Sequence, residues 1–217
     1  LFMVFEWNNP EYAEKGYNFG ERLLVCFFNA TTPRTAGFNT SDMTSLSDSG
    51  FFLTVILMFF GGAPASTAGG IKVTTTFIVL MGIISVFRGN RDIEIGKRRI
   101  HNASLRQALA VFVSCLAIVT TANLLICAVE QPRAERYPVE LLQNTPFFKA
   151  CLMETFSAMG TVGLSLGITP YLHSVSLLIL CLLMYAGRVG VVTLGLAFAE
   201  KKTTALVRKP TGDILIG

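Results

Sequence analysis

The sequence predicts an all-α integral membrane protein built from parallel tandem repeats, and three observations support this prediction. Of the 217 residues, 52% are hydrophobic and 15% are charged, whereas about a quarter of the residues of a soluble domain are charged. Several segments run for the length of a membrane span almost without charge, and one pattern recurs at a fixed offset. The composition leaves too little polar surface for a soluble globule, and it excludes disordered, collagen-like and disulfide-rich secreted classes.

Four segments have the hydrophobicity of membrane helices, and one of them, the first five residues, resembles the end of a helix. Gln107 to Val129 carries no charge and is long enough to cross a hydrocarbon core of ~30 Å at ~1.5 Å per residue. Gly50 to Phe87 is too long for one span, and the small-residue loop, defined as Gly61 to Gly70, divides it in two. Leu172 to Ala199 is uncharged except for Arg188.

The distribution of charge predicts the orientation of these segments. Arg88 to Arg106 and the tail after Ala199 hold ten of the 18 Lys and Arg residues. Basic loops stay on the cytoplasmic side of a membrane, so we expect both segments and the C-terminus there. Acidic residues near the N-terminus, among them Glu6 and Glu11, are expected on the opposite side. The net charge of +4 therefore indicates topology and no nucleic-acid surface.

Neither a catalytic site nor a resident metal or cofactor is predicted. The cysteines are five, with no CxxC pair, and His101 lies far along the chain from His173. Buried cysteines of this kind act as small hydrophobic residues. An intramembrane enzyme needs a Ser/Lys, Asp/Asp or His/Glu constellation, and the spans offer none. The protein is therefore not expected to be an enzyme.

One pattern repeats at an offset of 126 residues. Thr35-Ala36-Gly37-Phe38-Asn39 aligns with Thr161-Val162-Gly163-Leu164-Ser165, and Leu57 to Gly61 aligns with Leu183 to Gly187. A half-helix too short to cross the membrane precedes each Thr-x-Gly, at residues 18–32 and 146–157. The repeating unit is span, half-helix, Thr-x-Gly turn, span, which divides the chain into 1–103 and 104–217. Both copies run in the same direction, which favours a pore around an axis along the membrane normal.

A Thr-x-Gly turn at membrane depth has a specific chemical use. Glycine permits conformations in which successive carbonyls point the same way, and a ring of such carbonyls replaces the water around a cation. The half-helix directs its partly negative C-terminal end at the same place. The structural alternative is a glycine-rich bend that packs two helices closely, and the duplication of the turn disfavours it.

These motifs resemble those of the Trk/Ktr/HKT superfamily of potassium transporters. The resemblance rests on Thr31 to Thr40, Gly61 to Lys72, Ser157 to Ser165 and Gly187 to Gly190, and the Arg-Thr-Ala-Gly-Phe-Asn form is most like the membrane subunit of bacterial Ktr systems. It covers essentially the whole chain. It implies a potassium-channel-like fold of four units around one pore, of which this chain carries the third and fourth. The N-terminal repeats of the same protein would complete the pore.

The resemblance assigns functional residues to two groups. The potassium filter comprises Thr35, Ala36, Gly37, Phe38, Thr161, Val162, Gly163 and Leu164. The gate below it comprises Gly61, Gly62, Ser66, Thr67, Gly69, Gly70, Lys72 and Arg188.

Four charged residues are open to more than one interpretation. Arg188 either faces the pore or pairs with carbonyls of the small-residue loop, and an ionisable residue within a span is a functional candidate by default. Lys72 either faces the vestibule or extends to the membrane interface. Glu154 is expected to make structural hydrogen bonds rather than bind an ion, and Arg34 to brace the first turn.

The resemblance also implies a setting and partners. It predicts potassium uptake across a bacterial plasma membrane, with potassium as the substrate, sodium possible as a second ion, and no covalently bound cofactor. It further predicts contact with membrane lipid, a homodimer, and a cytosolic nucleotide-binding regulatory subunit (KtrA/TrkA-like). The alternative is a non-conducting structural or regulatory membrane subunit, which has no need of carbonyl turns in the membrane.

Overall fold

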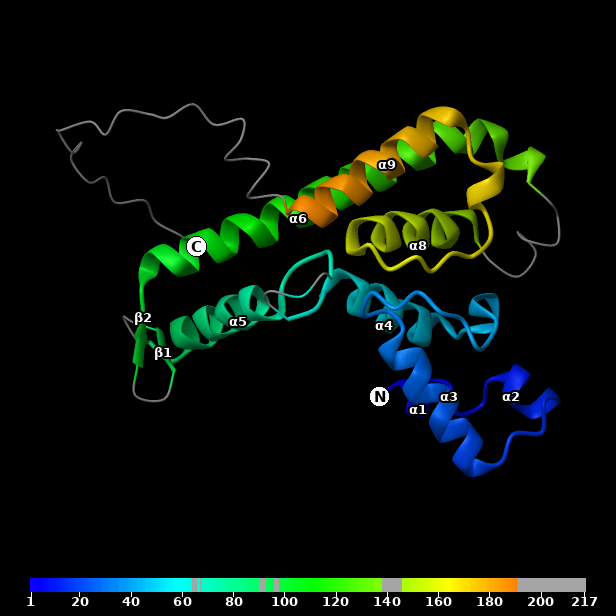
Figure 1. Ribbon diagram of the computed structural model, residues 1–217, viewed down its shortest axis with the longest axis horizontal. Coiled ribbons are helices and arrows are strands. Elements are labelled where there is room, and N and C mark those ends of the chain that lie inside the picture. The colour runs from blue at the N-terminus through cyan, green and yellow to red at the C-terminus, as the bar shows by residue number, and fades with distance from the viewer. Residues whose placement is uncertain (64–65, 67, 90–92, 96–97, 138–145, 191–217) are drawn as a thin grey trace.

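The computed structural model describes residues 1–63, 66, 68–89, 93–95, 98–137 and 146–190, and this part of the chain is mostly helical (Figure 1). A short antiparallel hairpin and three 3₁₀ turns complete it. The helices are α1 (Phe2–Phe5), α2 (Pro10–Glu14), α3 (Phe19–Thr31), α4 (Asp48–Phe59), α5 (Val73–Phe87), α6 (Asn102–Glu130), α8 (Phe147–Gly160) and α9 (Ser174–Val189). The hairpin strands are β1 (Ile93–Ile95) and β2 (Arg98–Ile100), and the 3₁₀ turns are Met43–Ser45, Gln131–Arg136 and Thr169–Tyr171.

Within the described part of the chain, the hairpin departs from the expectation of an entirely helical protein. It joins α5 to α6, and Ile93 pairs with Ile100 across it. Alternating β-branched residues favour strands, and the Ile-Glu-Ile sequence of β1 has this alternation. The basic segment between the helices was interpreted only for its charge, so this local preference was missed.

Among the described residues, one helix is long and apolar enough to cross a membrane. It runs from Ala103 to Arg133 and contains the predicted span at 107–129. The helices α4, α5 and α9 are apolar but shorter. The predicted division of Gly50 to Phe87 is confirmed, because α4 ends at Phe59 and α5 begins at Val73. Residues 191–199, the end of the last predicted span, lie outside the described residues.

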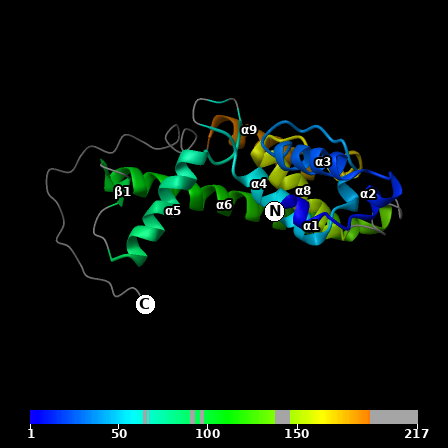
Figure 2. The ribbon, with the colours of Figure 1, turned by 90° about the horizontal axis from the view of Figure 1, so that it is seen from below.

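The long helix α6 organises the rest of the molecule. The helix α9 lies alongside one part of α6, and α5 packs against another part (Figures 1 and 2). The half-helix α8 contacts α6, α9 and α4. At the other edge, α1 contacts both α3 and α4, so α8 and α4 join the two halves of the chain.

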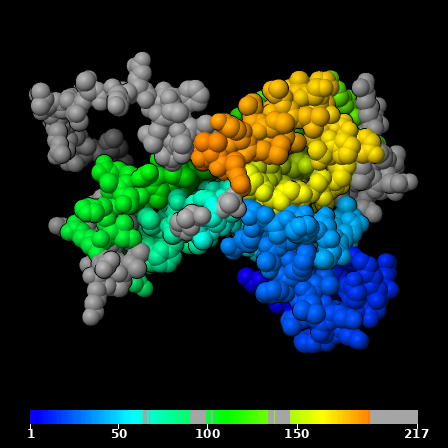
Figure 3. Space-filling model, in the orientation of Figure 1, coloured from blue at the N-terminus to red at the C-terminus, as the bar shows by residue number. Residues whose placement is uncertain are grey.

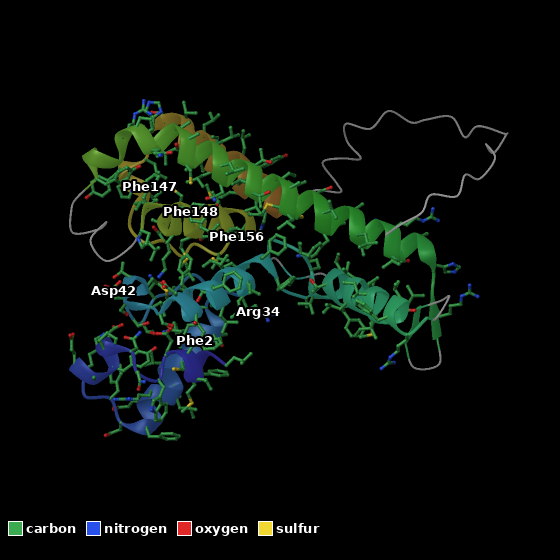
Figure 4. The ribbon with its side chains drawn as sticks, turned by 180° about the vertical axis from the view of Figure 1, so that it is seen from behind. Phe2, Arg34, Asp42, Phe147, Phe148 and Phe156 are labelled. Atoms are coloured by element: carbon green, nitrogen blue, oxygen red, sulfur yellow. The ribbon has the colours of Figure 1, made fainter. Side chains whose placement is uncertain are left out.

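Aromatic side chains fill the junction of α4, α6 and α8. The ring of Phe59 lies with its centroid 5.8 Å from that of Phe112 and 5.8 Å from that of Phe156, and Figure 4 shows Phe156 on α8. Such edge-to-face and tilted pairs stabilise a packed core beyond the area they bury. The junction therefore holds α8 against α4 and α6.

Candidate functional site

The first turn, defined as Thr35 to Phe38, follows the C-terminal end of α3. Both Thr35 (φ 70°) and Gly37 (φ 73°) adopt left-handed conformations, which cost a residue with a β-carbon energy. The amide of Ala36 donates to the carbonyl oxygen of Thr32 at 3.1 Å, and the hydroxyl of Thr32 donates to the carbonyl oxygen of Phe38 at 2.6 Å. The end of the half-helix thus holds both sides of this turn.

The second turn, defined as Thr161 to Leu164, has the same backbone pattern after α8. Thr161 (φ 53°) and Gly163 (φ 90°) are left-handed, at the positions equivalent to Thr35 and Gly37. The amide of Val162 donates to the carbonyl oxygen of Ser157 at 2.9 Å, and that of Gly163 donates to the Ser157 hydroxyl at 3.1 Å. Left-handed residues at alternate positions orient successive peptide groups alike.

The two turns lie in direct backbone contact, and the sequence-predicted filter residues are thereby brought together. A β-carbon added to Gly37 would lie 2.2 Å from the carbonyl oxygen of Val162 and 3.5 Å from the Cα of Gly163. In the space-filling view, the yellow chain around α8 borders the light-blue chain leading into α4 (Figure 3). Only glycine at position 37 allows so close an approach.

The two turns differ in what surrounds them. Phe38 is 71% exposed, whereas its counterpart Leu164 is 1% exposed. Ala36 is likewise exposed and Val162 buried. Beside the second turn, a cavity of about 370 Å³ is bordered by α8, the turn and α9. The second turn is therefore supported by the described chain on more sides than the first.

Glu154 supports the chain that leaves the second turn. It is buried in α8, and its carboxylate accepts hydrogen bonds from the hydroxyls of Ser165 at 2.5 Å and Thr169 at 2.9 Å. The Ser165 hydroxyl in turn accepts from the amide of Gly167 at 2.9 Å. The expected structural hydrogen-bonding role of Glu154 is confirmed.

The small-residue loop leaves α4 and returns to α5 through a narrow base. The amide of Gly61 donates to the carbonyl oxygen of Ile71 at 2.9 Å, and that of Ile71 donates to Phe59 at 3.2 Å. A β-carbon on Gly61 would lie 2.0 Å from the carbonyl oxygen of Gly69, so the two ends of the loop touch. Thr67, a predicted gate residue, lies outside the described residues, as do residues 64–65.

The C-terminal end of the small-residue loop lies against the second turn. The buried amide of Gly69 donates to the hydroxyl oxygen of Thr161 at 3.1 Å. A β-carbon on Gly69 would lie 2.4 Å from that oxygen and 3.0 Å from the carbonyl oxygen of Gly160. Predicted filter and predicted gate residues are therefore in contact at Thr161.

The two cations assigned to the gate lie on one cavity. The ammonium of Lys72 donates to the carbonyl oxygens of Ala68 and, at 3.3 Å, of Ser66, so it binds the small-residue loop itself. Arg188 is exposed near the end of α9. Both residues border a cavity of about 200 Å³ that Gly70 and Gly187 also line. Arg34 is exposed where α3 has ended (Figure 4).

Sequence reasoning missed a buried carboxylate at the start of α4. The sequence placed Glu6 only on one side of the membrane and gave no sign of its burial, yet it is 0% exposed. Its carboxylate accepts from the hydroxyl of Ser47 at 2.6 Å, the amide of Ser47 at 3.1 Å and the side-chain amide of Asn9 at 2.7 Å. Ser47 is the N-cap of α4, where a carboxylate also interacts favourably with the helix dipole.

A second buried carboxylate stands at the start of α9. Glu130 is 0% exposed and accepts from the amide of His173 at 2.8 Å, the hydroxyl of Ser176 at 2.5 Å and the hydroxyl of Tyr137 at 2.8 Å. His173 is the N-cap of α9 and lies 126 residues after Ser47. A glutamate roughly 40 residues before each such N-cap is the signal that points to these carboxylate clamps, Glu6 and Glu130.

Comparison with known proteins identifies relatives of this chain. A family model described as TrkH, cation transport protein, matches residues 1–207. Ktr system potassium uptake protein B of Bacillus subtilis is 36% identical over 215 residues, 99% of this chain and 44% of that protein. Potassium/sodium uptake protein NtpJ of Enterococcus hirae is 35% identical over 219 residues, 100% of this chain and 46% of that protein.

A third relative, Ktr system potassium uptake protein B of Vibrio alginolyticus, is 31% identical over 217 residues, 100% of this chain and 44% of that protein. The chain thus spans less than half the length of these relatives, which are named as uptake proteins and not as enzymes. The resemblance to Trk and Ktr proteins is confirmed. The chain belongs to the TrkH family of cation transport proteins.

Proposed function

We propose that the protein containing this chain carries potassium ions across the membrane, and that the backbone carbonyls of the two turns select the ion. One observation above all supports this proposal. The first and second turns share a left-handed Thr and Gly at the same offset and meet through Gly37 and Val162. A carbonyl ring that replaces the hydration shell of a cation requires such a convergence of backbones.

The electrostatics of the half-helices favour the same ion. The helix α8 ends directly before the second turn and α3 ends shortly before the first, and the C-terminal end of a helix carries about half a negative charge. Two turns make half of a four-sided ring. The N-terminal repeats of the same protein supply the other two, so that residues 1–103 and 104–217 act as the third and fourth parallel units around one pore.

The small-residue loop acts as the gate. It lies against Thr161 at one end, and Lys72 and Arg188 line the cavity beside it. A positive side chain near the ion path repels a cation, and glycines and small side chains let the loop move. Displacement of the loop from the second turn opens the path.

The setting follows from composition and relatives. The protein lies in the plasma membrane with its C-terminus in the cytoplasm, because the basic residues gather in 88–106 and after 199. It binds a cytosolic nucleotide-binding regulatory subunit, since two of the relatives are named as parts of Ktr systems, and it forms a homodimer, as the resemblance to Ktr proteins implies. Sodium is a second ion, coupled by symport, since one relative is named for potassium and sodium.

Uptake of rubidium by the purified full-length protein in lipid vesicles tests this function. We expect uptake above that of protein-free vesicles, inhibited by external potassium at lower concentration than by sodium. A matched control uses vesicles with the same protein unfolded by heat before reconstitution. Uptake equal to the control would replace the proposal by the alternative, a non-conducting structural or regulatory membrane subunit.

A further inference from the structure

Thr161 is the residue at which the small-residue loop meets the second turn. The hydrogen bond from the amide of Gly69 to its hydroxyl oxygen, at 3.1 Å, joins residues 92 apart in the chain. Other hydrogen bonds of the loop backbone stay within the loop, such as that from Ser66 to the carbonyl oxygen of Ala63 at 3.1 Å, or close its base, such as that from Val73 to the carbonyl oxygen of Gly62 at 3.2 Å. The contact with Thr161 ties the C-terminal end of the loop to a neighbouring element.

The atoms around this hydrogen bond are also closely packed. A β-carbon on Gly69 would lie 2.4 Å from the hydroxyl oxygen and 2.7 Å from the methyl carbon of Thr161, and one on Gly70 would lie 3.5 Å from the Cα of Gly160. The loop backbone thus rests directly on the residue that starts the turn. Neither a longer side chain nor a water molecule fits between them.

The first turn supplies an internal comparison. Thr35 has the same residue type and the same left-handed conformation as Thr161, 126 residues earlier. Among the hydrogen bonds of the described residues, however, the side chain of Thr35 makes none, and it is not among the atoms that the loop approaches. The threonine hydroxyl is therefore not needed to form the turn, and in the second turn it is used to hold the loop.

We infer that Thr161 is a positioning residue that couples the small-residue loop to the second turn, with its backbone shaping the turn and its hydroxyl holding the loop closed. The inference rests on the proposed filter and gate. Opening the loop breaks the bond from Gly69 and leaves the Thr161 side chain free to rotate. Loop position and the conformation of the second turn then change together.

Rubidium uptake by variants of the full-length protein in vesicles tests the coupling. Thr161→Val removes the hydroxyl and keeps the shape, and a lost hydrogen bond of this kind shifts an equilibrium by about two- to tenfold. We expect an increase in flux of that size, and restoration of the original flux by Thr161→Ser. Gly69→Ala, which alters only the loop side of the contact, is expected to raise flux as well.

The matched control is Thr35→Val, studied with and without residues 63–68 of the loop. Thr161→Val should raise flux only in the protein that has the loop, whereas any effect of Thr35→Val should be the same in both backgrounds. An increase by Thr161→Val that persists without the loop, or an equal increase by Thr35→Val, overturns the coupling.

Failure of the coupling is distinguishable from failure of the proposed function. Substitution of Gly37 or Gly163 changes potassium/sodium discrimination if the turns form the filter. If discrimination changes while Thr161→Val and Thr35→Val behave alike, the filter stands and the coupling is wrong. If discrimination stays unchanged, the proposed filter itself is wrong, and the inference falls with it.

Discussion

Replacement of Gly37 by alanine is the sharpest test of the two turns. The left-handed conformation at φ 73° costs a residue with a β-carbon about 1–2 kcal/mol, which is a factor of about five to thirty in an equilibrium. The new methyl carbon would also lie 2.2 Å from the carbonyl oxygen of Val162. Backbone cannot rotate away as a side chain can, so the two turns must separate.

The expected result is a weaker and less selective site. If the competent arrangement of carbonyls is populated five- to thirtyfold less, the apparent KM for potassium rises by about that factor. Gly163→Ala has the conformational cost at φ 90° but no overlap, since the nearest heavy atom lies 4.0 Å away. We therefore expect a larger rise in KM, and more sodium uptake, for Gly37→Ala than for Gly163→Ala.

The assay is rubidium uptake in vesicles across a series of potassium and sodium concentrations. Gly16→Ala is the matched control, because Gly16 is also left-handed at φ 63° and has no heavy atom within 4 Å of the added carbon. It should leave KM unchanged. Equal KM and equal potassium/sodium discrimination in the original protein and both turn variants, at normal membrane levels, would refute the filter.

Four further predictions concern the gate and two carboxylates. Deletion of residues 63–68 should raise flux. Arg188→Gln should also raise flux, because one charge at ~5 Å repels a cation by about 3 kcal/mol at an effective dielectric near 20. If Arg188→Gln raises flux further in the protein without residues 63–68, Arg188 acts as a pore charge, and if it does not, Arg188 holds the loop; reduced flux in the single variant contradicts both roles. Glu130→Gln should lower the melting temperature in detergent, because a buried hydrogen-bond donor that loses its carboxylate acceptor costs about 1–3 kcal/mol. An equal effect of Glu14→Gln, at an exposed position, would contradict this. Burial raises the pKa of Glu11, but hydrogen bonds from Lys15 and Ser45 lower the pKa overall from its ordinary value of 4.5. The ionised carboxylate therefore stabilises the fold above that pH, and this stabilisation is lost at lower pH. Glu11→Gln should reduce the acid sensitivity of the melting temperature, and an unchanged dependence on pH would contradict this.

Local features of the fold could be predicted from the sequence. Runs of apolar residues and the glycines that interrupt them predict the break between α4 and α5 and the positions of α3, α6 and α8. Both signals depend on residues that lie within a few positions of each other. The two Thr-x-Gly turns follow from the repeat. Each depends on residues close together in the chain, where conformational preference and hydrophobicity are readable.

Contacts between residues far apart in the chain could not be predicted from the sequence. Glu6 and Glu130 accept hydrogen bonds from residues 41 and 43 positions away, and a glutamate near the end of a span has the same appearance whether it is a surface charge or a buried cap. Lys72 was expected at the vestibule or the interface, and its hydrogen bonds to carbonyls of the small-residue loop were not foreseen. The bond between Gly69 and Thr161 spans 92 positions, and no local pattern encodes it.

The carboxylate clamps hold α4 and α9 at one end, and close packing holds them at the other. Glu6 and Glu130 bind the N-terminal ends of these helices. At the opposite ends, where the small-residue loop starts and Arg188 stands, Phe59 packs against Phe112 and Phe156, and a β-carbon on Gly187 would lie 2.0 Å from the carbonyl oxygen of Met159. The small-residue loop and Arg188 therefore extend from helices that are anchored at both ends.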